Sequence, residues 1–415
     1  MSPIAPAGET FRKFASVRVS PEMALLVLCA RTRLSSEKAS EIRALVAAQP
    51  DWTRLLRLAS THTVTPLFGR SLECAARDMV PEEILGKLKE ASRANTIRCL
   101  FLSAELAKIL EDFGGESILA VPYKGPVAAL QAYGDVALRE FGDLDIILQH
   151  KDIPRAHELL SVRGYTPRFP WLFSSGTKSR QIPGEYNYTD SSRRVMVELH
   201  TERTLRHFPV TPEITSLASP FVPVEIAGQT VLTFSPEVAL VLLCLHGAKD
   251  FWERLSWVVD VSELVESRPE MNWEAVFTRA QALRSLRIVL LGLWVAREFL
   301  GTQLPRDVAR RLDADRVSML LARRIKACIL GCSGPGLGAL ERFHFRRLLV
   351  PGVVAGARYS LRLTLAPSED DWSSFTLPRA LSALYPILRP LRLLRKYGVR
   401  RGRTESSAPA SQSGT

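Results

Sequence analysis

The sequence has few cysteines, and their spacing fits neither a disulfide framework nor a zinc site. The 415 residues include six cysteines, all within apolar, helix-like stretches: Cys29, Cys74, Cys99, Cys244, Cys328 and Cys332. A secreted disulfide scaffold would have denser cysteines set among turns. Cys328 and Cys332 lie one helical turn apart, but no second cysteine pair accompanies them. We therefore predict buried free thiols in a reducing compartment and no zinc.

Long hydrophobic runs are also missing. The most apolar stretches, 238–245 and 288–295, are far shorter than the ~20 residues that a membrane-spanning helix needs. Residues 1–10 lack the basic region and apolar core of a signal peptide. These absences predict a cytoplasmic protein without a transmembrane segment.

Negative charge is in deficit, because 55 Lys and Arg face 43 Asp and Glu, a net charge of +12. Much of the excess lies in the last third, including the arginine-rich run 389–403. Such charge could serve nucleotide phosphates, an acidic partner, a membrane surface or solubility. No RNA-binding module and no interleaving of aromatic and basic residues is recognisable, which argues against nucleic acid as the partner.

Hydrophobic periodicity divides the chain into helical and strand-like parts. We predict an α+β protein that is mainly helical, with a small mixed α/β sheet between two helical domains. The predicted boundaries are an N-terminal tail 1–19, a helical domain 20–115, an α/β domain 116–235, a helical domain 236–400 and a disordered tail 401–415. Strand-like runs are expected at 117–123, 144–148, 186–189 and 194–200, followed by a hairpin over 222–234.

Charged residues interrupt two of these apolar strands. Asp143 and Asp145 alternate with Leu144 and Ile146, so both carboxylates should project from the same face. Glu198 stands in the same way within the strand 194–200. Neighbouring carboxylates repel each other unless a cation lies between them, and hard divalent ions are held in this manner. The pattern predicts a metal site formed by the three carboxylates.

Several motifs together resemble the uncharacterised bacterial nucleotidyltransferase family of the polymerase-β-like superfamily. They are Tyr-Lys-Gly-Pro at 123–126, Leu-Arg at 138–139, Gly-Asp-Leu-Asp-Ile at 142–146, Gly-Tyr at 164–165 and Val-Glu-Leu-His at 197–200. Similar segments around Trp52, at 246–260 and at 391–398 extend the resemblance over about residues 20–400. The combined spacing is specific, although no single motif is.

The resemblance implies a catalytic role for Asp143, Asp145 and Glu198, with Mg²⁺ or Mn²⁺ as cofactor and an NTP such as ATP as substrate. Lys124-Gly125-Pro126 takes the place of the superfamily's Gly-Ser turn, which leaves the details of phosphate binding open. The residues implied in nucleotide binding are Lys124, Gly125, Arg139, His246 and Lys249. His200 and Asp260 are candidates for supporting the metal ligands.

Alternatives stay open at several positions. Arg139 could reach a triphosphate or pair with an aspartate, and His200 could be a base-like group or a satisfied core histidine. The basic amphipathic segment 388–401 could contact a membrane surface, but packing on the body with its arginines outward is favoured.

The leading functional hypothesis is transfer of a nucleoside monophosphate from an NTP to a hydroxyl, amine or phosphate acceptor, by two-metal carboxylate catalysis. The alternatives are a catalytically inactive nucleotide-binding or regulatory protein with the same fold, and a nucleic-acid nucleotide-adding enzyme. Neither the acceptor nor the oligomeric state can be read from the residues.

Overall fold

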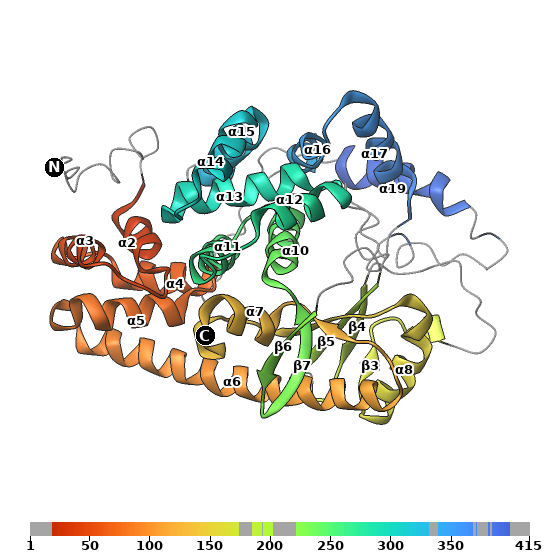
Figure 1. Ribbon diagram of the computed structural model, residues 1–415, viewed down its shortest axis with the longest axis horizontal. Helices are drawn as coiled ribbons and strands as arrows, with labels where there is room; N and C mark the ends of the chain where they lie inside the picture. Colours follow the sequence, from red (N-terminus) through yellow and green to blue (C-terminus); the bar gives the residue numbers. More distant parts are fainter. Residues whose placement is uncertain are drawn as a thin grey trace, which may run out of the picture.

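The protein is a mainly helical molecule with a small mixed sheet between its helical parts, as the sequence predicted (Figure 1). The computed structural model describes residues 19–173, 185–192, 194–201, 221–331, 339–367, 371, 381 and 384–398. The long helix α6 (Glu82–Gly115) runs along one side of the sheet, and the C-terminal helices cover the other side (Figure 1). The predicted domain boundaries stay predictions, and the predicted tails 1–19 and 401–415 lie almost wholly outside the described residues.

The N-terminal helices begin at side chains that satisfy free backbone N–H groups. Ser20, Ser35 and Asp51 each accept a hydrogen bond from the backbone N–H three residues further on. The helices are α2 (Pro21–Cys29), α3 (Ser36–Ala47), α4 (Trp52–Thr61), α5 (Thr65–Ala76) and α6, with the 3₁₀ turn η1 (Arg77–Met79) before α6. The segments 82–89 and 96–113 each have the apolar periodicity of a separate helix, and they join into the single helix α6 because no proline or glycine lies between them.

Five strands form the central sheet in the order β1-β2-β5-β4-β3. β2 and β5 are parallel, and the other neighbours are antiparallel. The strands are β1 (Val121–Pro122), β2 (Asp143–Ile147), β3 (Thr166–Pro167), β4 (Glu185–Thr189) and β5 (Met196–His200). The connections contain α7 (Gly125–Tyr133), η2 (Val136–Leu138), η3 (His150–Asp152), α8 (Ile153–Val162) and η4 (Pro170–Phe173). The short strand β3 was not expected from the sequence.

The two faces of the sheet differ in polarity. Leu144, Ile146, Val197 and Leu199 point to one face and are buried with apolar side chains of α6 and α8. Asp143, Asp145, Glu198 and His200 therefore point to the other face, because side chains alternate along a strand. The apolar face of the sheet thus packs against α6 and α8. The polar residues lie on the opposite face, on the side of α7 and the C-terminal helices.

A separate hairpin follows the sheet, formed by β6 (Phe221–Ile226) and β7 (Gln229–Phe234). Its two-residue turn, Ala227-Gly228, has positive φ at both positions, which suits the twist of antiparallel strands. The Thr233 hydroxyl donates to the carbonyl of Pro122 at 2.6 Å, so the hairpin is fastened to β1.

The C-terminal helices up to residue 348 share one hydrophobic core with the N-terminal helices α2–α5. Trp252, which is fully buried, packs closely on Gly247 and Gly292 and so fixes the end of α10. The helices are α10 (Pro236–Lys249), α11 (Leu255–Ser267), α12 (Trp273–Ala282), α13 (Leu286–Leu300), α14 (Arg306–Ala314), α15 (Arg316–Ile329), α16 (Ala339–Leu348), α17 (Val353–Leu365) and α19 (Tyr385–Gly398). No described helix has both the length and the apolar character needed to cross a bilayer.

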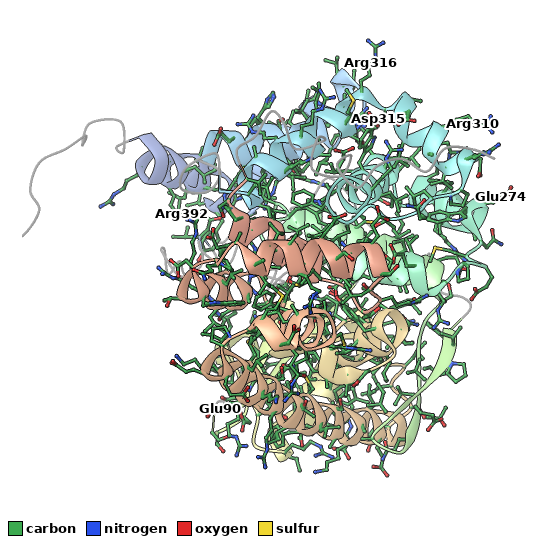
Figure 2. All side chains as sticks on the ribbon, turned by 90° about the vertical axis from the view of Figure 1, so that its left-hand side faces the viewer. Glu90, Glu274, Arg310, Asp315, Arg316 and Arg392 are labelled. Carbon is green, nitrogen blue, oxygen red and sulfur yellow. The ribbon has the colours of Figure 1, made fainter. Side chains whose placement is uncertain are left out.

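The arginines of α19 do not all face outward, contrary to the expectation from the sequence. Arg389 pairs with Asp371 at 2.5 Å, and Arg392, labelled in Figure 2, also pairs with Asp371. Asp371 is only 1% exposed, and a buried carboxylate needs positive partners. Burial of this charge turns the two arginines inward and leaves Ile387 and Leu391 exposed.

Candidate functional site: a carboxylate and histidine group on the sheet

The parallel pairing of β2 and β5 brings their acidic residues together. The register places Asp145 beside Glu198, and Ile147 beside His200. Because side chains two residues apart share a face, Asp143, Asp145, Glu198 and His200 all project to the same side. The same-face prediction for the three carboxylates therefore holds in the geometry, although their catalytic role stays a prediction.

Asp145 is the most enclosed of the acids. Its Oδ1 accepts hydrogen bonds from the ammonium of Lys124 at 2.6 Å and lies 2.8 Å from Nε2 of His200. Burial alone would raise the pKa of Asp145, but the charge of Lys124 and the hydrogen bond with His200 lower it below its usual value. Its other oxygen, Oδ2, is buried without a hydrogen-bond partner in the described part of the chain.

Glu198 and Asp143 are held more loosely. Glu198 lies 3.6 Å from Nε2 of His200 and 3.5 Å from the side-chain amide of Asn187. Burial and the neighbouring Asp145 charge raise the pKa of Glu198 to about 7. Asp143 is half-buried and makes no hydrogen bond or ion pair with any described residue, and burial followed by Asp145 raises its pKa. The described residues of the cluster therefore carry too little positive charge to balance all three carboxylates.

These residues fit a divalent cation. One ligand atom each from Asp145, Glu198 and His200 lies within 4.8 Å of the others. The orphaned Oδ2 of Asp145 is an oxygen that a hard ion would satisfy. Compared with the predicted trio, His200 joins this compact group and Asp143 stands outside it. Asp143 is nevertheless on the same face, next to the group.

Lys124 and Gly125 stand at the start of α7, directly after β1. Gly125 has φ of +54°, and a Cβ there would lie 3.3 Å from the carbonyl oxygen of Asp143. Glycine is therefore suited to this position both by its conformation and by the close approach of β2. Burial would lower the pKa of Lys124, but Asp145 raises it well above its usual value, so the side chain stays charged.

Arg139 is committed to Asp260. Its guanidinium donates two hydrogen bonds to the Asp260 carboxylate, at 2.8 and 2.9 Å, and the Tyr133 hydroxyl donates a third at 2.7 Å. All of this lies in the interior, where a bidentate pair is strongest. Of the two alternatives for Arg139, the geometry shows an aspartate pair, and the partner comes from α11. Asp260 thus supports Arg139, and among the described residues no hydrogen bond or ion pair joins it to the carboxylate group.

His246 and Lys249 occupy the C-terminal end of α10 on the carboxylate side of the sheet. The ammonium of Lys249 pairs with Glu185, the residue of β4 that lies opposite His200. His246 is 3.5 Å from Asp250 and meets the ring of Trp257 edge-on. Burial, followed by the positive charge of Lys124, holds the pKa of His246 well below its usual value. Lys249 therefore brings charge to the site, while His246 is neutral.

Three residues of the site were missed from the sequence. Glu185 and Asn187 lie on β4 opposite His200 and Glu198, and the ring of Tyr123 meets His200 edge-on at 5.2 Å. The alternation of Glu185 and Asn187 with Tyr186 and Tyr188 carries the relevant signal, since it resembles the alternation around Glu198. The turn at Ser191-Ser192 makes the pairing of these consecutive strands predictable, but the register that sets Glu185 opposite His200 comes from the structure.

A mixed sheet with clustered carboxylates on one face, set between helical regions, has the architecture of a nucleotidyltransferase. The chain belongs to the uncharacterised nucleotidyltransferase family, whose model matches residues 48–301. A similar solved structure is that of an antigenic nucleotidyltransferase-like protein from Paracoccidioides brasiliensis, with 18% identity and a TM-score of 0.32. That likeness covers 52% of this chain and 92% of the other. No curated protein matches the chain.

Proposed function

We propose that the protein is a metal-dependent nucleotidyltransferase that moves a nucleoside monophosphate from an NTP to a hydroxyl, amine or phosphate acceptor. The observation that carries this is the buried, unpartnered Oδ2 of Asp145 beside Glu198, in a chain that belongs to a nucleotidyltransferase family. An oxygen of this kind is costly to bury unless a cation or donor completes it.

The metal would be held by Asp145 and Glu198, with Asp143 as the third carboxylate of a two-metal arrangement and His200 beside them. Mg²⁺ or Mn²⁺, when bound, would neutralise phosphate charge and favour deprotonation of the acceptor. Asp143 supports this role because it shares the face and is not engaged with any described side chain. His200 would orient Asp145 through the contact at 2.8 Å.

Nucleotide phosphates would meet Lys124, Gly125 and Lys249. The two lysines carry positive charge on either side of the carboxylate group, and Gly125 lets a phosphate approach the backbone at the start of α7. Arg139 and His246 remain proposed nucleotide contacts. Asp260 already accepts two hydrogen bonds from the Arg139 guanidinium. A direct contact with the nucleotide would therefore require Arg139 to share its N–H donors between the two.

Calorimetric titration with NTP in the presence and absence of Mg²⁺ tests the proposal. The wild type should bind NTP only with metal, and Asp143→Asn and Asp145→Asn should each weaken this by at least about tenfold. Asp112→Asn is the matched control, because Asp112 lies on α6, on the apolar side of the sheet, and pairs there with Arg163 at the end of α8. A wild type that binds no nucleotide with metal would refute the proposal.

Pyrophosphate release separates turnover from binding. Metal-dependent NTP binding without pyrophosphate release across a panel of small-molecule, saccharide and peptide acceptors would favour a regulatory protein that keeps the fold. Incorporation of labelled nucleotide into short RNA, persisting at moderate salt, would instead indicate a nucleic-acid acceptor.

A further inference from the structure

Two adjacent helices near the end of the chain present large apolar side chains to solvent. α17 exposes Val353, Val354 and Leu361 by 80%, 74% and 62%, and α19 exposes Ile387 and Leu391 by 64% and 58%. The helices pack against each other beside α16, at one end of the molecule (Figure 1). We call these five side chains, with the exposed Arg358 and Arg395, the α17–α19 surface.

On α19, the apolar character of the exposed side follows from how the helix is rotated. Arg389 and Arg392 reach inward to the buried Asp371, and Arg389 also donates to the carbonyl of Leu363 on α17 at 3.1 Å. With these arginines inside, the exposed side chains among those described on α19 are Ile387, Leu391 and Arg395. The exposure of Ile387 and Leu391 therefore accompanies the buried ion pairs of Asp371.

The C-terminal part of the sequence, which includes both helices, is strongly basic. Residues 341–415 contain thirteen Lys and Arg against five Asp and Glu, so they carry +8 of the net charge of +12. Neither α17 nor α19 contains an acidic residue. Arg358 follows Val354 by one helical turn, and Arg395 follows Leu391 in the same way. On each helix, an exposed apolar side chain is therefore followed one turn later by an arginine.

We propose that the α17–α19 surface docks on an anionic lipid membrane, with its apolar side chains in the interfacial region and its arginines at the headgroups. The apolar side chains suit the interfacial region of the bilayer, and the neighbouring arginines suit its anionic headgroups. Neither helix contains an acidic residue that would be repelled there. A second copy of the chain fits less well, because a symmetric contact would set this surface against itself, and neither α17 nor α19 offers a carboxylate to pair with Arg358 or Arg395. The membrane would hold the enzyme near a substrate or acceptor at the lipid surface, without a spanning helix.

Flotation of the full-length protein with lipid vesicles tests this. The wild type should float with phosphatidylcholine vesicles that contain about a third phosphatidylglycerol, and not with pure phosphatidylcholine. The triple variant Leu361→Gln/Ile387→Gln/Leu391→Gln keeps every charge and should bind at least about tenfold more weakly. Arg358→Gln/Arg395→Gln should weaken binding roughly fivefold per arginine and reduce its dependence on salt.

The control variant is Ile97→Gln/Leu100→Gln, which removes two residues on α6 that are exposed by 60% and 56% and should float like the wild type. Circular dichroism checks that each variant is folded. A wild type that does not float, or a triple variant that floats equally well, overturns the proposal. Self-association of the wild type in light scattering that the triple variant abolishes would assign the surface to a second copy and overturn it too.

Discussion

Asp143 and Asp145 are two residues apart on one strand, yet their surroundings give them different physical roles. Asp145 is buried and balances the buried ammonium of Lys124, whereas Asp143 is half-buried and pairs with no described residue. Asp145 therefore contributes to folding as well as to the proposed site. Asp143 is available for a ligand at little structural cost.

This difference predicts opposite stability effects for the two substitutions. Asp145→Asn leaves Lys124 buried without its nearest counter-charge and should lower the free energy of unfolding by roughly 3 kcal/mol. Asp143→Asn removes a charge that Asp145 repels, and should leave stability unchanged or raise it by up to about 1 kcal/mol. Urea unfolding without metal measures both. Equal losses for the two variants would contradict the assigned surroundings.

At the scale of elements, the start of α7 links the Lys-Gly turn to the carboxylate strand. Gly125 opens the helix with positive φ and lies against the backbone of β2 at Asp143. Gly134 ends the same helix, also with positive φ, but a Cβ there would meet nothing within 4 Å. A comparison of Gly125 with Gly134 therefore separates the effect of backbone conformation from the effect of close packing.

Gly125→Ala should destabilise the protein more than Gly134→Ala. The conformational penalty of roughly 1 kcal/mol applies to both positions. At Gly125 the contact of 3.3 Å with the Asp143 carbonyl adds about 1 kcal/mol more and pushes on β2. Denaturant unfolding gives the difference, and metal-dependent NTP binding should weaken only in Gly125→Ala. Identical effects at both positions would mean that β2 tolerates the added methyl group.

At the scale of the whole molecule, His62 joins the N-terminal helices to the C-terminal ones. Its Nδ1 accepts a hydrogen bond from the backbone N–H of Leu255 at 3.3 Å, and its carbonyl accepts from Ser256 at 3.2 Å. Burial, followed by the charge of Arg254, lowers the pKa of His62 to about 4. The ring is thus neutral in the folded protein at neutral pH, as the accepted hydrogen bond requires.

This junction should make stability depend on pH. Between about pH 4 and 6.5 the unfolded chain binds a proton at His62 that the folded chain does not, so the free energy of unfolding falls as pH falls. The loss amounts to roughly 3 kcal/mol across that window. In His62→Asn the amide oxygen can still accept the hydrogen bond from Leu255. The dependence of the free energy of unfolding on pH should fall by the equivalent of about one bound proton. Exposed His344, replaced by Asn, is the control, and an unchanged slope in His62→Asn would contradict the prediction.

Much of the fold and part of the site could be predicted from local patterns. Alternation in 143–147 and 196–200 correctly indicated that Asp143 and Asp145 share a face, and that Glu198 and His200 share one. The merging of two helical patterns into α6 and the short strand β3 were missed, because a pattern shows where a helix is possible and not where packing extends it. Glu185 and Asn187 were missed because their relevance depends on the neighbour of β4.

Periodicity by itself determined where most of the helices and strands lie, which of their faces is apolar, and on which face of its strand each acid stands. Only the tertiary structure decided the partners: Lys124 with Asp145, Arg139 with Asp260, and Asp371 with the arginines of α19. The physical reason is that alternation sets direction within a strand or helix, whereas an ion pair depends on distance between segments up to 121 residues apart. In α19 the tertiary structure also decided which face of the helix is exposed. The arginines turn inward to the buried carboxylate of Asp371, and the apolar side chains on the other face are exposed.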